Sequence, residues 1–195
     1  MEMFKAIDEI ISNVLSSMGG FAPLLACLLI LVESILPVLP LAVFITINFY
    51  YFGTVVGFII SHVLACVGCF ISFKLCRTKL KKHFDSMLDK KEHKKLKKLM
   101  KVLNELKLEQ LTIFIAIPFT PAFLVNIAAG LSNMEQKKFM ISIIIGKIFM
   151  VYFWGFIGTS LLQSLKDPSI LIKIGIIILI AFIISKIVNK KFRLE

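Results

Sequence analysis

Hydrophobic residues form long runs along most of this 195-residue chain, and one polar segment separates the runs into two groups. A helix needs about 20 apolar residues to cross a bilayer. The runs at 53–76, 139–161 and 170–188 meet this length and predict three transmembrane helices. The runs at 21–52 and 111–130 contain prolines near their centres and need a different explanation.

The first of these runs, residues 21–52, has an unsuitable length for simple crossings. Its 32 residues are too many for one untilted helix and too few for two. Pro37 and Pro40 lie in its middle, and proline interrupts a helix by removing a hydrogen-bond donor. We therefore expect two half-helices that meet at the prolines and form a re-entrant hairpin over 21–52.

The run at 111–130 repeats this arrangement, because Pro118 and Pro121 follow Pro37 and Pro40 by 81 residues. Each proline pair begins a unit of hairpin followed by transmembrane helix. A hairpin returns to the side it entered from, and the helix after it crosses once, so the second unit starts from the opposite face. The pattern predicts an inverted repeat, which is a common plan of secondary transporters.

Charge is concentrated in the polar segment, where 13 of the 23 Lys and Arg residues lie between 74 and 107. Apolar residues recur there at steps of three and four, so residues 77–107 predict a basic amphipathic helix. The positive-inside rule places it in the cytoplasm together with Lys137, Lys138 and the basic C-terminal tail. That placement requires 111–130 to return rather than to cross. We expect the lysines to bind anionic headgroups, although a solvated linker helix that only fixes topology is an alternative.

Composition and the N-terminus complete the expected architecture. With 58% hydrophobic residues and a mean hydropathy of +0.90, the chain is more apolar than soluble domains, about half of whose residues are apolar. Residues 1–20 are acidic, end in Gly19 and Gly20, and predict an interfacial helix rather than a secretory signal. We therefore expect a single all-α membrane domain over 1–195. The sequence leaves a homo-oligomer open and suggests no nucleic-acid partner.

Three acidic or basic residues lie well inside the apolar runs, away from their ends: Glu33, His62 and Lys147. Such groups are costly in a bilayer and usually mark a transport pathway. Glu33 lies one turn before Pro37 and is a candidate proton acceptor, or a structural carboxylate that caps a broken helix. Lys147 is a candidate partner for an anion or for Glu33, and His62 either lines the pathway or bonds to a neighbouring group.

The remaining candidates are amides that follow the proline pairs, Asn48 and Asn126. They serve either the backbone groups freed at the breaks or the pathway. The chain contains no nucleophile elbow, no metal-binding spacing of Cys and His, and no phosphate-binding glycine loop. We therefore expect no enzymatic activity, no metal and no cofactor.

The stretches "ESILPVLPLAVFITINFYYFGTVVGFIIS" and "IPFTPAFLVNIAAGLSNMEQKKFMISIIIGK" resemble the DedA superfamily, also called the VTT-domain or SNARE-associated Golgi proteins, and more narrowly its Tvp-like bacterial branch. The resemblance implies opposed re-entrant hairpins in a multi-pass protein of the bacterial plasma membrane. It also implies movement of phospholipid or undecaprenyl phosphate between leaflets. The family usually has an arginine three residues before the first proline of the second hairpin, where this chain has Ile115.

We therefore expect a lipid translocase of the flippase or scramblase type, with proton coupling as an option. Phosphate recognition by the family arginine cannot be transferred to Ile115, and Lys147 is a candidate to replace it. A small-solute or ion carrier of the same fold is one alternative, and a membrane assembly factor that transports nothing is another. Glu33 and Lys147 discriminate between these classes, because an assembly factor has no need of charges at this depth.

Overall fold

The computed structural model describes residues 21–35, 41–81, 94–120, 122–164 and 167–191. Every regular element in these ranges is a helix. Three helices are long and apolar enough to cross a membrane: Leu41–Leu80, Gln136–Ser164 and Ser169–Lys190. The prediction of an all-α membrane protein is thus confirmed. The expected interfacial helix at 1–20 lies outside the described residues.

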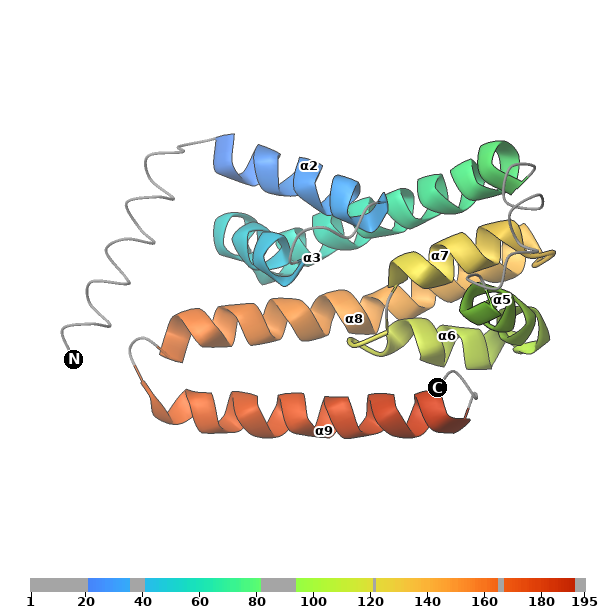
Figure 1. Ribbon diagram of the computed structural model, residues 1–195. Helices are drawn as coiled ribbons and strands as arrows, with labels where there is room; N and C mark the ends of the chain where they lie inside the picture. The colour runs from blue at the N-terminus through green and yellow to red at the C-terminus, as the bar shows by residue number, and fades with distance from the viewer. Residues whose placement is uncertain (1–20, 36–40, 82–93, 121, 165–166, 192–195) are drawn as a thin grey trace.

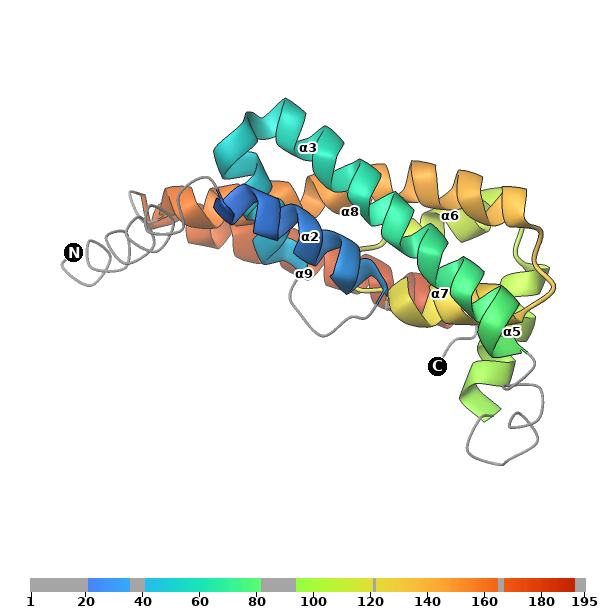
Figure 2. The ribbon, with the colours of Figure 1, turned by 90° about the horizontal axis from the view of Figure 1, so that it is seen from above.

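The first repeat consists of α2 (Phe21–Ile35) and α3 (Leu41–Leu75), and a bend at Gly53 divides α3 in two (Figure 2). Gly53 has φ 77° and ψ 169°, a conformation that a side chain would disfavour. The bend separates a short arm, 41–52, from a long arm, 54–75. It coincides with the expected boundary between hairpin and transmembrane helix. Pro37 and Pro40 lie outside the described residues.

The second repeat consists of α6 (Leu108–Ala116), α7 (Ala122–Leu131) and α8 (Gln136–Ser164). Residues 117–120 separate α6 from α7 without helical structure, and Pro118 lies in this break. The Thr120 N–H donates to the Ile117 carbonyl over 3.2 Å and closes the turn. Pro121, the second expected break residue, is not among the described residues. The final helix is α9 (Ser169–Lys191).

The two hairpins point toward each other from opposite ends of the molecule, as Figure 1 shows. The helices α2 and α6 start at opposite ends and finish near the middle, with α2 beside α3 and α6 beside α8. The repeats also share a packing contact. A side chain at Gly68 would collide with Ser34, and one at Gly146 would collide with Ile115, which follows Ser34 by 81 residues. In both repeats, a glycine of the long helix thus packs against the same position of the hairpin.

Glycines also let each hairpin approach the long helix of the other repeat. A β-carbon at Gly155 of α8 would overlap the ring of Phe49, and one at Gly158 would overlap Thr46. In the second hairpin, a β-carbon at Gly130 would come within 2.7 Å of the Phe73 carbonyl oxygen on α3. Small residues at such crossings allow close contact between membrane helices. The two repeats are therefore interlocked rather than placed side by side.

The basic segment forms two described helices, η1 (Cys76–Leu80) and α5 (Lys94–Glu105). The amphipathic character of α5 agrees with the sequence pattern, but its apolar face packs on protein. Leu103 is fully buried in the apolar cluster around the second hairpin, and Leu99 and Met100 pack against that cluster. Binding of the lysines to anionic headgroups stays a prediction.

Candidate functional site

Lys147 lies at the point where the two hairpins meet. The apolar core consists of one cluster around each hairpin, and Lys147 lies between them on α8. Ile143, one turn earlier, belongs to the cluster around the second hairpin, and Val151, one turn later, belongs to the cluster around the first. The Lys147 side chain is only 1% exposed. We call this region the hairpin junction: Glu33, Ser34, His62, Thr120, Asn126 and Lys147.

The ammonium group of Lys147 is poorly satisfied. Its Nζ atom lies 3.3 Å from the Met150 sulfur, which is a weak acceptor. Among the described residues no oxygen atom accepts a hydrogen bond from Nζ, and no carboxylate forms an ion pair with it. A buried cation without such partners is costly. The described contacts of Lys147 therefore offset little of the cost of burying its charge.

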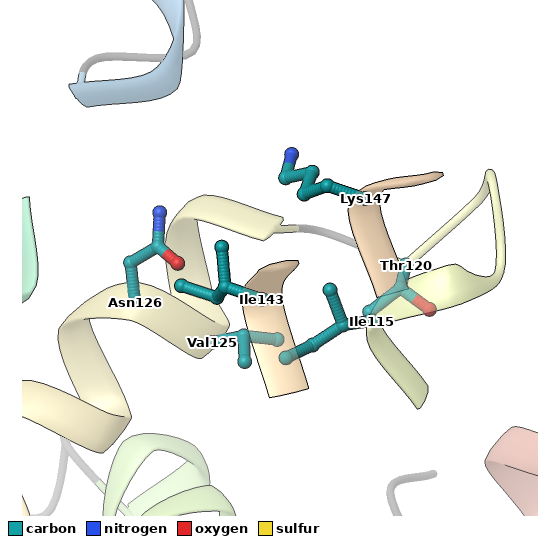
Figure 3. A pocket seen from close by; sticks show the side chains of 6 residues that line it. All are labelled: Ile115, Thr120, Val125, Asn126, Ile143 and Lys147. Carbon is teal, nitrogen blue, oxygen red and sulfur yellow. The ribbon is translucent and has the colours of Figure 1, made fainter. Parts of the chain in front are cut away.

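A small cavity adjoins Lys147 and connects it to the second hairpin (Figure 3). Its lining comes from α6, the break, α7 and α8: Ile115, Thr120, Val125, Asn126, Ile143 and Lys147. Its volume is about 10 Å³, close to the minimum for one water molecule.

A hydrogen bond from Asn126, on the second hairpin, connects the first hairpin to this cavity. The side-chain nitrogens of Asn126 and Lys147 point to the same side of the cavity in Figure 3. On that side the Asn126 amide donates to the backbone carbonyl of Ser34 over 3.3 Å. Ser34 lies at the end of α2, so this hydrogen bond joins the two hairpins near their tips.

The structure also brings the other two ionisable candidates to Lys147. Glu33 precedes Ser34 on α2, is partly buried, and lies close enough for its charge to interact with that of Lys147. His62 of the α3 long arm interacts with Lys147 as well. The His62 ring stacks on Phe58 with 5.7 Å between ring centroids. Glu33, His62 and Lys147, which come from three helices, therefore lie in one region of the structure.

Three buried polar atoms in the described residues lack a hydrogen-bond partner: Ser34 Oγ, His62 Nδ1 and Thr120 Oγ1. All three belong to the hairpin junction. Buried polar groups in proteins are nearly always hydrogen-bonded, so we expect water or a polar ligand beside these atoms. Together with the Lys147 ammonium, these atoms come from both hairpins and both long helices. All four are polar groups in one region whose hydrogen bonds the described residues do not complete.

Asn48, in contrast, lies apart from the cavity. It is fully buried, and its amide donates to Ser61 Oγ over 3.1 Å and contacts the Cys27 sulfur at 3.6 Å. These contacts join α2, the short arm and the long arm of α3. The structure thus gives Asn48 a packing role within the first repeat, and only Asn126 of the two predicted amides lines the cavity.

Arg77 is a residue that the sequence did not single out. From η1 its guanidinium donates to four backbone carbonyls at the end of the second hairpin: Ala129 at 3.3 Å, Gly130 at 3.4 Å, Ser132 at 3.0 Å and Met134 at 2.6 Å. The last carbonyls of a helix lack partners within the helix. Arg77 therefore caps α7 and fixes the hairpin to the end of α3.

Comparisons with known proteins agree with this architecture. The VTT-domain family model matches residues 37–160, which include both proline pairs and most of α8. The "Uncharacterized membrane protein YhjE" of Bacillus subtilis (strain 168) is 29% identical over 183 residues, which cover 94% of this chain and 87% of that protein. No solved structure matches the chain significantly. The match covers more than half of the sequence, so this chain belongs to the VTT-domain (DedA) family of membrane proteins.

Proposed function

We propose that this protein moves lipids between the two leaflets, with the headgroup passing through the hairpin junction. One observation carries the proposal: Lys147 is buried between the two hairpins, and no oxygen atom of the described residues accepts a hydrogen bond from it. A charge at such a depth costs a few kcal/mol. A protein that only scaffolds an assembly gains nothing from this cost, whereas a translocase needs a polar site inside the membrane.

In this mechanism the phosphate of the headgroup binds the Lys147 ammonium, and Asn126 offers a further donor on the same side of the cavity (Figure 3). Glu33 balances the lysine charge while the site is empty and takes up a proton when the phosphate arrives. The acyl or prenyl tails stay in the bilayer, because the long helices present apolar side chains outward. Since the cavity holds about one water, each transport event requires the hairpins to part.

The first test is the substitution Glu33→Gln in proteoliposomes that contain a fluorescent phospholipid. We expect the variant to fold normally and to lose lipid movement by at least about tenfold, because glutamine cannot exchange a proton or balance the lysine charge. Chemical quenching of the outer leaflet measures the rate of lipid movement. The matched control is Glu135→Gln, which changes an exposed carboxylate before α8 and should leave the rate unaltered.

Full lipid movement by a folded Glu33→Gln variant would exclude Glu33 from the mechanism. The same vesicles, loaded with small organic anions in place of labelled lipid, test the carrier alternative. Anion flux without lipid movement by the wild-type protein would favour a carrier of the same fold.

The second test concerns the orientation of the two hairpins in the membrane. We expect single cysteines at Phe21, the first residue of the first hairpin, and at Glu135, which follows the second hairpin, to face opposite sides. Both native residues are exposed, and the four native cysteines are replaced beforehand. A membrane-impermeant maleimide on intact cells should label position 21 at once and position 135 only after permeabilisation. Labelling of both positions from one side would contradict the inverted repeat.

A further inference from the structure

The tip of the second hairpin is held by aromatic rings from two other helices. Phe119 lies in the break between α6 and α7, and its ring contacts Trp154 of α8 and Phe182 of α9, each at 5.9 Å between centroids. Phe153 of α8 lies at 6.5 Å. All three pairs have an edge-to-face geometry, with interplanar angles of 73–82°, which aromatic pairs prefer. Phe119 is therefore the point where α9 touches the hairpin tip.

The helix α9 has few other contacts. It runs beside α8 (Figure 1), and only Ile174 and Ser185 are buried among its described side chains. Val188 packs against the apolar cluster at the base of the second hairpin. The helix also lies beyond residues 37–160, where the family model matches. Its contacts thus include both the tip and the base of one hairpin, and many of its other apolar side chains are exposed.

We propose that α9 is a clamp that keeps the second hairpin closed over the cavity at Lys147, with the contact between Phe182 and Phe119 as its releasable part. The geometry requires the coupling, because Thr120 lines the cavity and follows Phe119 directly. When the tip moves away from Lys147, Phe119 must leave the ring of Phe182. Half of the Phe182 surface is already exposed, so the contact is small enough to break and form repeatedly.

The clamp is tested by the reactivity of a cysteine at position 120 in the full-length protein without its native cysteines. Phe182→Ala should raise the rate of modification by a small, water-soluble methanethiosulfonate reagent about threefold to tenfold, the effect expected from one aromatic pair. Phe182→Leu, which keeps bulk without the ring, should raise the rate less. The control Leu179→Ala removes an apolar side chain that is 58% exposed on the same helix and should leave the rate unaltered.

An unaltered or slower rate in Phe182→Ala and Phe182→Leu would overturn the clamp, as would an equal increase in Leu179→Ala. The expected consequence for transport rests on the proposed function: the Phe182 variants should move lipid faster. The two proposals fail separately. If wild-type protein moves no lipid, the translocase proposal is wrong, whereas the modification rate of position 120 still decides the clamp.

Discussion

Lys147→Met is expected to abolish lipid movement while making the protein more stable. Methionine has nearly the length of lysine and fits an apolar site without a charge. Removing the buried ammonium group, whose one hydrogen bond among the described residues goes to the Met150 sulfur, should stabilise the folded protein by about 1–3 kcal/mol. The same change removes the cation that would bind a headgroup phosphate, so we expect the translocation rate to fall at least about 100-fold.

Two measurements on the same sample separate these effects. Denaturant unfolding in mixed micelles measures stability, and proteoliposomes measure lipid movement. Lys173→Met on α9 is the matched control, because that lysine is exposed and should change neither quantity much. A Lys147→Met variant that is less stable and fully active would contradict the proposal, since Lys147 would then act through structural contacts. Lys147→Arg keeps the charge and should retain part of the activity.

The hairpins themselves were predictable from the sequence because they depend on local chemistry. A proline pair interrupts a helix wherever it occurs, and the length of each apolar run limits the number of crossings. The boundary before Gly53 follows from the same count, and the structure shows a positive φ there. The family could be recognised because the proline pairs and the residues after them are continuous in sequence, and the family match confirms it.

The hydrogen-bond partners of each polar residue could not be predicted in this way. Asn48 and Asn126 follow their proline pairs by similar distances, yet Asn48 bonds to Ser61 and Asn126 bonds to Ser34. The second of these contacts joins residues that are 92 positions apart. Which amide lines the cavity depends on how the two repeats interlock, and no pattern within one repeat contains that information.

The surroundings of the basic segment could not be predicted from the sequence either. Apolar residues at steps of three and four predict that α5 has an apolar face. They do not show whether lipid or protein covers this face, because both provide apolar surroundings. The structure places Leu103 in the core around the second hairpin. The role of Arg77 was the hardest to predict, because Arg77 is only one of the 13 Lys and Arg residues between positions 74 and 107. Its four acceptors lie more than 50 positions later.

Arg77→Gln is expected to lower the free energy of unfolding by about 3 kcal/mol or more and to loosen the second hairpin. Hydrogen bonds to a charged group contribute about 1.5–3 kcal/mol each, and Arg77 donates four, of which those to Ser132 and Met134 are the shorter. We expect the four hydrogen bonds together to contribute about as much as two full-strength ones, because the Arg77 side chain is partly exposed. The positive charge also lies at the negative end of the α7 dipole, where it stabilises the helix. The substitution removes the contact between the guanidinium and the Phe73 ring as well, in which the guanidinium carbon lies 4.4 Å from the ring centroid.

Denaturant unfolding and hydrogen exchange of the α7 amides measure the two effects. Lys79→Gln, two residues later and exposed, is the matched control for loss of a positive charge at this boundary. Arg77→Lys should be intermediate, because a lysine keeps the charge but lacks the planar fork that reaches several carbonyls at once. If Arg77→Gln unfolds like the wild type and α7 exchanges no faster, then water at the membrane surface already satisfies these carbonyls. The second hairpin would in that case be held by its apolar contacts alone, chiefly those of Val125, Ala128 and Ala129 with the core.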